Sequence, residues 1–299
     1  MITEWTNGAQ NEVVMDGILN EVNLKPGTDL KTGQPTIFGD FTIKTTNTID
    51  GKDFISEIPI RVYQKEKTLK GTNNPAYDNA LRIMNDFVSV AAGGEENADY
   101  VRIASSGSLG ENAFISKNSG MLISGPVVRA SFINKIKKSE AQNGAKFKVV
   151  IVIGQLINEI NKAGEETGRL IIKGILPQYN NKVDVIDFIV ENPKVINHVQ
   201  NNWQQGDTVL IGGYINFTSK VDEVEEPNGF GEPIITRRTK TVRELIVTGG
   251  HESPLTDEEG AYDSDSITKA INERKERLEK KKEEAASAPA TKTPMNFGF

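Results

Sequence analysis

The sequence predicts a mainly β protein made of two tandem five-stranded barrels, each with one helix, followed by a flexible charged tail. Three observations predict this fold. Many segments alternate hydrophobic and polar residues with a period of two, as half-buried strands do. The same order of elements occurs twice along the chain, and the composition changes abruptly after residue 250. The clearest alternation lies in residues 206–217, where Ile211, Ile215 and Phe217 share one face and Tyr214 lies on the other.

The first half of the chain follows a short polar lead-in, residues 1–11. Its expected elements are strands at 12–25, 36–46 and 54–63, a helix at 75–90, and strands at 99–105 and 120–136. Asp50-Gly51 is typical of a hairpin turn. Leu81, Met84 and Val88 have the spacing of one helical face. The Gly/Ser/Asn-rich segment 106–120 is expected to be a loop between the last two strands.

The second half repeats this order. Its expected elements are strands at 146–161, 169–179 and 182–190, a helix at 193–203, and strands at 206–217 and 239–250. Pro193 suits the first turn of the helix. Gly212-Gly213 predicts a bulge or sharp bend in a barrel strand. The segment Leu156–Asn161 is similar to Ile18–Asn23 and occupies the same place in the order, which favours an internal duplication.

Three strands, a helix and two more strands are the element order of the OB barrel, whose helix lies between the third and fourth strands. A β-sandwich would need more strands and usually has no central helix. We therefore expect two tandem OB-like five-stranded barrels. The expected domains are an OB-like domain at 1–138, a second at 139–250, and a charged tail with a helix and an aromatic tip at 251–299.

Composition excludes several classes of protein. The 299 residues include no cysteine and two histidines, so disulfides and thiolate metal sites are impossible and a zinc site is not expected. No hydrophobic run approaches the ~20 residues of a membrane helix, and no signal peptide is evident, so a cytoplasmic location is expected. There is no phosphate-binding loop, no GxGxxG spacing and no catalytic triad. We expect neither an enzyme nor a cofactor.

The candidate binding residues lie on the outward faces of the predicted strands. OB barrels commonly bind single strands across their second and third strands, where bases stack on aromatic rings and phosphates contact cations. The predicted single-stranded DNA-binding residues are Phe38, Lys44, Arg61 and Tyr63 in the first barrel and Arg169, Lys173, Tyr179, Lys182, Tyr214, Arg237 and Arg238 in the second. The alternative is that the rings are half-buried at barrel rims and the cations are simply solvated.

Charge favours single strands over duplex. The formal net charge of the whole chain is −6, and basic and acidic residues nearly balance within each predicted barrel. A duplex-binding domain usually carries a net basic surface. A single strand needs only a few phosphate contacts when stacking contributes as well.

The tail differs in composition from both barrels. Acidic residues dominate 252–265, and residues 266–286 are expected to form a solvated helix because few of them are hydrophobic. A linker rich in Ala, Pro and Thr leads to the C-terminal tip, Met295–Phe299. Phe297 and Phe299 are predicted to bind partner proteins, with the terminal carboxylate held by a cation. The alternative is a frayed end without a partner.

The strands 206–217 and 242–250 and the tip from Pro294 to Phe299 resemble those of phage-type single-stranded DNA-binding proteins with OB folds. Bacterial proteins of this class end in an acidic tip with a terminal Phe that recruits replication and repair enzymes. Here the acids lie far upstream, and the chain has two barrels where the common bacterial protein has one.

The resemblance implies sequence-independent binding and protection of single-stranded DNA in replication, recombination and repair, in the cytoplasm of a bacterial host. It also implies that the tail recruits replication and recombination proteins. Two alternatives stay open at the level of sequence. One is a structural or assembly β-protein of a virion, whose outward rings would be interface anchors. The other is an RNA-directed binder.

Overall fold

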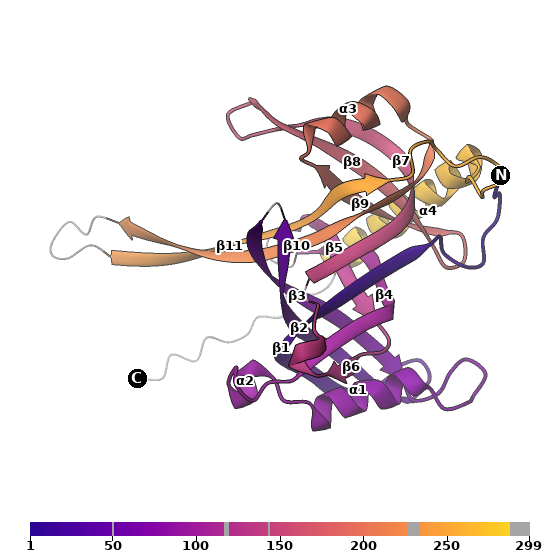
Figure 1. Cartoon of the computed structure of the whole chain (residues 1–299). Helices are drawn as coiled ribbons and strands as arrows, with labels where there is room; N and C mark the ends of the chain where they lie inside the picture. The colour runs from indigo at the N-terminus through magenta and orange to yellow at the C-terminus, as the bar shows by residue number, and fades with distance from the viewer. Residues whose placement is uncertain (50, 117–119, 143, 227–233, 288–299) are drawn as a thin grey trace.

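Two closed barrels share one continuous sheet (Figure 1). The computed structural model describes residues 1–49, 51–116, 120–142, 144–226 and 234–287. The strands are β1 (Asn11–Thr28), β2 (Pro35–Ile49), β3 (Lys52–Lys65), β4 (Tyr100–Ile115), β5 (Leu122–Ala130), β6 (Asn134–Ile136), β7 (Gly144–Ile160), β8 (Glu166–Gln178), β9 (Lys182–Val190), β10 (Thr208–Glu226) and β11 (Ile234–Gly250). The helices are α1 (Pro75–Asp86), α2 (Val90–Gly93), α3 (Pro193–Asn202) and α4 (Ser264–Ser287), with a short 3₁₀ turn at Lys138–Glu140.

The first barrel consists of β1 to β5 with α1 between β3 and β4. Antiparallel pairs join β1 to β2, β2 to β3 and β4 to β5. A short parallel pair at Ile60 and Val128 joins β3 to β5, and β4 returns to β1 from Gly107 to Tyr100. This closed order, with α1 and the four-residue α2 between β3 and β4, confirms the OB-like barrel predicted from the sequence.

The second barrel repeats the arrangement with β7 to β11 and α3. The parallel pair now joins β9 to β11 at Ile189 and Ile246, and β10 returns to β7. The predicted bulge is present, because the pairing register of β10 and β11 shifts between Gly212 and Gly213. Helices α1 and α3 begin in the same way: the side chains of Asn74 and Asn192 each accept a hydrogen bond from the backbone nitrogen two residues on, and proline follows each.

The barrels are joined through β1. Its first third, Asn11–Asp16, pairs with Gly144–Val149 of β7, while the overlapping segment Val13–Ile18 pairs with β4. The β2–β3 hairpin also contacts the second barrel. Asn47 and Ser56 both donate hydrogen bonds to the backbone carbonyl of Ile215. One hydrophobic core therefore runs through both barrels, with Val13 and Met15 of β1 between them.

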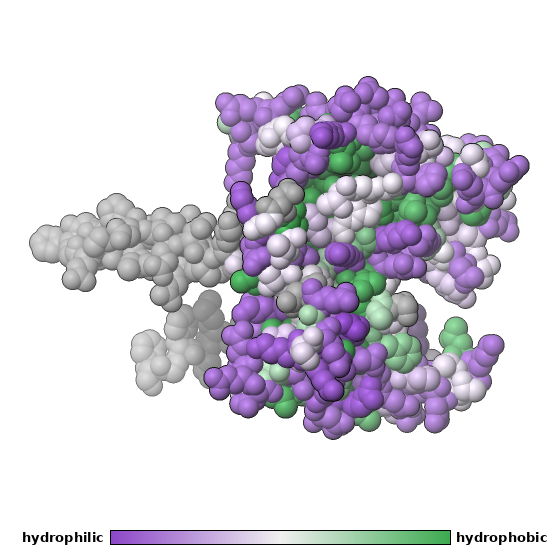
Figure 2. Space-filling view, viewed as in Figure 1, coloured by the Kyte–Doolittle hydropathy of each residue, from purple (hydrophilic) through white to green (hydrophobic). Residues whose placement is uncertain are grey.

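Hydropathy follows this arrangement. In Figure 2 the surfaces of the two lobes, which carry α1 and α3 at opposite ends, are mostly hydrophilic. Hydrophobic residues are visible in the lobe that carries α3, beneath that helix, and in smaller patches where the two lobes meet. None of the helices in the described part of the chain is long and hydrophobic enough to cross a membrane.

Two predicted segments differ from the structure. The predicted loop 106–120 is mostly strand, since β4 continues to Ile115 and pairs with β5 from Gly107 onward. Buried Gly107 and Leu109 alternate with half-buried Ser106 and Ser108 there, a strand pattern hidden in a composition typical of loops. The second correction concerns β10, which continues to Glu226, well beyond the expected strand end at residue 217.

The lead-in and the tail helix are also not solvated as predicted. Trp5, Tyr262, Ile267 and Ala270 are buried together in a second hydrophobic cluster on the outer face of the second barrel. The ring nitrogen of Trp5 donates to the carbonyl oxygen of Gln178 at 2.8 Å. The few hydrophobic residues of α4 therefore form a narrow stripe that packs on the sheet, and the rest of the helix is exposed.

Candidate nucleic-acid interface

The outer face of the first barrel carries an open row of two rings and one cation. Lys25, Phe38 and Tyr63 lie directly opposite one another on β1, β2 and β3. Phe38 is 42% exposed and Tyr63 is 54% exposed, and Lys25 is exposed too. Gly27 makes room for the Phe38 ring, since a Cβ there would collide with it. The sequence had placed Phe38 and Tyr63 on this face, and the strand register brings them side by side.

The Tyr63 hydroxyl is held by a carboxylate at the rim of this face. It donates to Asp29 at 2.7 Å, and the ammonium group of Lys65 lies 2.9 Å from the same carboxylate. The hydrogen bond from Tyr63, and then those from Lys65 and Thr32, lower the pKa of Asp29 far below its ordinary value. The hydrogen bond to Asp29 in turn raises the pKa of Tyr63. This network orients the ring while most of its surface stays in water.

Lys44 and Arg61 lie on the same face. Asp40 is directly opposite Arg61, and Lys44 is directly opposite Glu57. Lys44 is 3.8 Å from Glu95, an exposed ion pair of the kind that contributes little. Both cations are thus placed as the sequence predicted, beside carboxylates that reduce the net charge of the face.

The corresponding face of the second barrel is partly covered. Val150, Val152, Ile175 and Val183 point outward from β7, β8 and β9, and they are buried beneath the N-terminal segment and α4. Figure 1 shows α4 lying beside this barrel next to the N-terminus. The two barrels share a topology, but their second and third strands are not equally accessible.

Arg169 is enclosed by carboxylates. Its guanidinium group lies 2.9 Å from Glu244, 3.2 Å from Glu191 and 3.4 Å from Glu159. Burial lowers the pKa of Arg169, but the hydrogen bond and charge of Glu244 and the other two carboxylates outweigh it, so the pKa is raised. Three acidic neighbours leave this cation poorly suited to a phosphate.

The other predicted residues are dispersed. Lys173 lies half-buried opposite Asp187. Tyr179 and Lys182 are exposed at the β8–β9 turn, where the backbone nitrogens of Asn180 and Asn181 donate to the N-terminal segment. Arg237 and Arg238 belong to β11, opposite Glu223 and Asp222, and their side chains lie outside the described part. Phe297 and Phe299 lie outside the described residues altogether.

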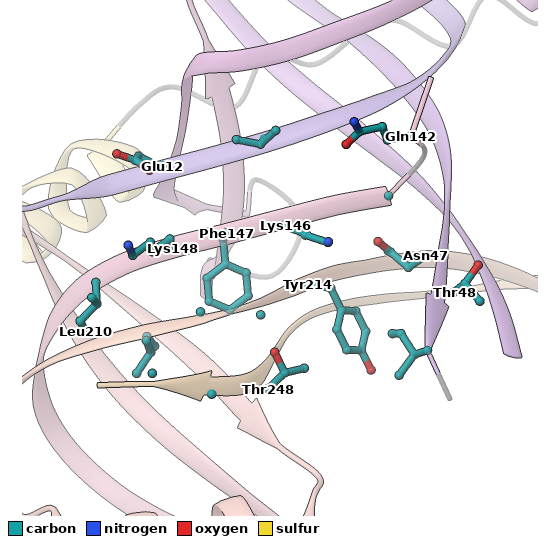
Figure 3. A pocket seen from close by; sticks show the side chains of 18 of the residues that line it. Glu12, Asn47, Thr48, Gln142, Lys146, Phe147, Lys148, Leu210, Tyr214 and Thr248 are labelled. Carbon is teal, nitrogen blue, oxygen red and sulfur yellow. The ribbon is translucent and has the colours of Figure 1, made fainter. Parts of the chain in front are cut away.

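Tyr214 lies in a groove between the barrels, which Figure 3 shows from close by. The groove has a volume of 1210 Å³. Lys146 and Lys148 of β7 and Tyr214 of β10 lie on one side, and Thr48 of the β2–β3 hairpin lies across from them. Glu12 of β1 also lines it.

Sequence reasoning missed both lysines of this groove. Lys146 and Lys148 are exposed and alternate with buried Ala145, Phe147 and Val149, so their outward parity was visible in the sequence. Both lysines lie on the first strand of the second barrel, whereas the predicted residues of that barrel lie on its later strands and on the turn between β8 and β9. Among the described residues, neither lysine has a carboxylate within 4.0 Å of its ammonium group.

The open face and the groove are joined by β2. Phe38, Lys44, Thr46 and Thr48 share one parity of this strand and all point outward. Thr46 and Thr48 line the groove, while Phe38 lies on the open face. A continuous surface therefore leads from the rings of the first barrel to the lysines of the second. The described part of the chain contains no cluster of three His, Asp or Glu residues that could hold a metal ion.

Comparison with known proteins gives one family and one fold. Residues 9–284 match the family model described as YorF. The crystal structure of the wild-type single-stranded DNA binding protein from Thermus aquaticus is similar to this chain, with a TM-score of 0.50 and 13% identity, over 84% of this chain and 95% of that one. A variant of that protein with a deletion and a substitution has a TM-score of 0.49 and 13% identity, over 85% and 98%. No curated protein matches the chain in sequence.

Proposed function

The chain belongs to the YorF family, and from its doubled barrel and open aromatic face we propose that it binds single-stranded DNA without regard to sequence. The observation that carries this proposal is the row of Lys25, Phe38 and Tyr63 across three neighbouring strands. Two exposed rings offer stacking surfaces to successive bases, and Lys25 and Arg61 offer contacts to phosphates. The similar Thermus aquaticus structure is that of a single-stranded DNA binding protein, which supports the same function.

Stacking and charge both favour the binding of an unpaired strand over that of a duplex. Stacking contributes roughly 1–3 kcal/mol per base and does not depend on base identity. A duplex hides the faces of its bases, so it could use only the cations, and carboxylates such as Asp40 and Glu57 lie beside them. A chain with net charge −6 then has little attraction for duplex.

The proposal also includes a role in the cell and a role for the C-terminal tail. We propose that the protein coats single strands during replication or recombination, in the cytoplasm. Residues Phe297 and Phe299 would recruit the proteins that act there. Deletion of residues 294–299 should leave DNA affinity intact and abolish capture of those partners in a pull-down from a host extract. If the protein without residues 294–299 still captured those partners, the proposed role of the tail would be refuted.

Fluorescence anisotropy with a labelled oligonucleotide tests the binding function. The protein should bind single-stranded DNA, and unlabelled single strands should compete far better than duplex. Phe38→Ala and Tyr63→Ala should each weaken binding by about 1–3 kcal/mol. Phe132→Ala is the matched control, because Phe132 is 43% exposed and follows β5, outside the row on β1, β2 and β3.

Four results would count against the proposal. Failure of the unaltered protein to bind single strands would refute it outright. Equal competition by duplex would refute the role of stacking. Unchanged affinity in both Phe38→Ala and Tyr63→Ala would show that the strand lies elsewhere. An RNA competitor as effective as DNA would move the proposal to the RNA-directed alternative.

A further inference from the structure

The groove between the barrels contains two glycines that face each other on neighbouring strands. Glu12, Lys148, Gly212 and Gly249 are successive register partners on β1, β7, β10 and β11, so they form one row. The two glycines of this row leave the backbone bare beside Lys148. Such a flat surface admits a planar group, since nothing projects from it.

Gly249 is not required by the fold. A Cβ at the neighbouring Gly213 or Gly250 would collide with backbone oxygens, so close packing requires glycine at both. A Cβ at Gly249 would meet no atom within 4 Å, and the backbone there does not have a positive φ. The groove therefore stays open at Gly249 although the local structure would accept a side chain.

The next row supplies a ring and a second cation. Val14, Lys146 and Tyr214 are register partners on β1, β7 and β10. Lys146 and Lys148 lie two residues apart on the same face of β7, about 6.6 Å along the strand. That separation is close to the spacing of successive phosphates in an extended nucleic-acid strand. Tyr214 lies one row along β10 from Gly212, and both residues line the groove.

We propose that this groove is a nucleotide-binding subsite for the same single strand. A base lies on the backbone at Gly212 and Gly249 against Tyr214, and Lys146 and Lys148 contact the phosphates on either side of it. This inference rests on the proposed function. The strand passes from Phe38 along the outward residues of β2 into the groove, and it does not cross the covered face of β8 and β9.

Charge and size agree with this occupant. Glu12 and Asp53 line the groove as well, so it is not strongly cationic and would not attract a duplex by charge alone. Its volume of 1210 Å³ exceeds the roughly 300–1,000 Å³ of a usual small-molecule pocket, so it holds more than a single nucleotide.

A single introduced thiol tests the occupancy directly. Because the chain has no cysteine, Gly249→Cys places a unique reactive group in the groove. Its modification by a maleimide reagent should slow at least tenfold when an oligonucleotide of about 30 bases saturates the protein, a length that covers two barrel sites. Thr268→Cys is the control, since it lies exposed on α4, and its modification rate should not change.

A second pair of variants tests the two lysines without adding a group. Lys146→Ala with Lys148→Ala should weaken binding of the same oligonucleotide about tenfold. It should also reduce the slope of log affinity against log salt concentration by about 1.4, from 0.7 per phosphate. The double variant Lys162→Ala with Lys194→Ala removes two exposed lysines that do not line the groove, and it should retain the full affinity and slope.

The outcomes separate this inference from the proposed function. Loss of all single-strand binding in the unaltered protein would overturn both. If the unaltered protein binds but Gly249→Cys is modified equally fast with and without DNA, the groove is empty in the complex and the inference fails alone. Equal protection by duplex would overturn the assignment to a single strand. Protection by single strands only, together with the smaller salt slope, supports the subsite.

Discussion

At the scale of the residue, the ring of Tyr63 serves two partners. Its edge is fixed by the hydrogen bond to Asp29, and its face is free for a base. The hydroxyl group of Tyr63 therefore orients the side chain, while its aromatic ring is the group that would bind a base. This separation can be tested, because Phe retains the ring and lacks the hydroxyl.

We expect Tyr63→Phe to bind single-stranded DNA within about twofold of the unaltered protein, while Tyr63→Ala loses about 1–3 kcal/mol. The Tyr63 hydrogen bond is the largest cause of the lowered pKa of Asp29, so Tyr63→Phe should also raise that pKa toward its ordinary value of 3.8. An NMR titration of the Asp29 carboxyl measures this change. If Tyr63→Phe weakened binding as much as Tyr63→Ala, the hydroxyl and not the ring would be the binding group.

A second group of residues joins distant parts of the chain. Arg274 of α4 donates two hydrogen bonds to Glu111 of β4, and Glu111 also accepts from Ser124 and from the backbone of Val185. Burial raises the pKa of Glu111, but the hydrogen bond from Arg274 and the others outweigh it, so the pKa is lowered. Burial raises the pKa of the neighbouring Asp184.

Arg274→Met should lower the free energy of unfolding at neutral pH by about 3–5 kcal/mol, because it leaves Glu111 buried without its partner. Arg277→Met is the control, since Arg277 is exposed on the same helix and its loss should cost little. Urea unfolding of both variants measures the difference. If Arg274→Met lowers the free energy of unfolding only as much as Arg277→Met does, the ion pair between Arg274 and Glu111 contributes nothing to stability.

The pH dependence of this effect follows from the pKa directions. A lowered pKa means that Glu111 contributes stability above its ordinary value of 4.5, and that the contribution is lost as the pH falls through the folded-state value. The raised pKa of Asp184 acts in the opposite sense and offsets part of this loss. The difference in the free energy of unfolding between Arg274→Met and the unaltered protein should therefore become smaller as the pH falls below about 4.5. A gap that widens toward acid would contradict the assignment.

At the scale of the element, α4 is a cover for the second barrel. Ile267 and Ala270 pack on Val152, Ile175 and Val183, which a bare barrel would expose to water. The N-terminal segment completes the cover, and the rings of Trp5 and Tyr262 meet edge to face at 5.2 Å. Covering this face has a functional consequence, since it removes part of the surface that the first barrel offers openly.

Ile267→Ala should lower the free energy of unfolding by about 2–5 kcal/mol, the usual cost of truncating a buried aliphatic side chain. Thr268→Ala, at the exposed position beside it, should change stability by less than about 0.5 kcal/mol. Thermal unfolding followed by circular dichroism distinguishes the two. A melting temperature unchanged by Ile267→Ala would show that α4 does not stay docked in solution.

At the scale of the whole molecule, the barrels share β1 and one hydrophobic core. The segment Asn11–Asp16 pairs with both β4 and β7, so opening the first barrel at β1 also removes a strand partner from β7 of the second barrel. We expect the two barrels to unfold together. The chain carries a reporter for this, because both tryptophans, Trp5 and Trp203, lie against the second barrel.

Phe41→Ala removes a fully buried side chain from the first barrel and should cost about 3–5 kcal/mol. If the barrels are coupled, the urea midpoint of tryptophan fluorescence should fall together with that of circular dichroism. Leu81→Ala is the control, since Leu81 is partly exposed on α1 and its loss should leave both midpoints nearly unchanged. A fluorescence midpoint unaffected by Phe41→Ala would show that the barrels unfold separately.

The chain by itself determined the order of elements, the duplicated barrel, the start of a helix at Pro193 and the bulge at Gly212-Gly213. These features depend on local periodicity, turn chemistry and backbone sterics, all of which lie within a few residues of one another. The outward parity of Phe38 and Tyr63 was readable for the same reason. Their pairing into one row with Lys25 needed the strand register.

Only the tertiary structure decided which outward faces stay open. Nothing near Ile175 or Val183 shows that Trp5 and Ile267, far away in sequence, cover them. Likewise, Lys146 and Lys148 become the wall of a groove only because β1 and β10 lie on either side of β7. Exposure depends on contacts between segments that are distant in the sequence. Such contacts produce no periodic pattern in the sequence from which they could be predicted.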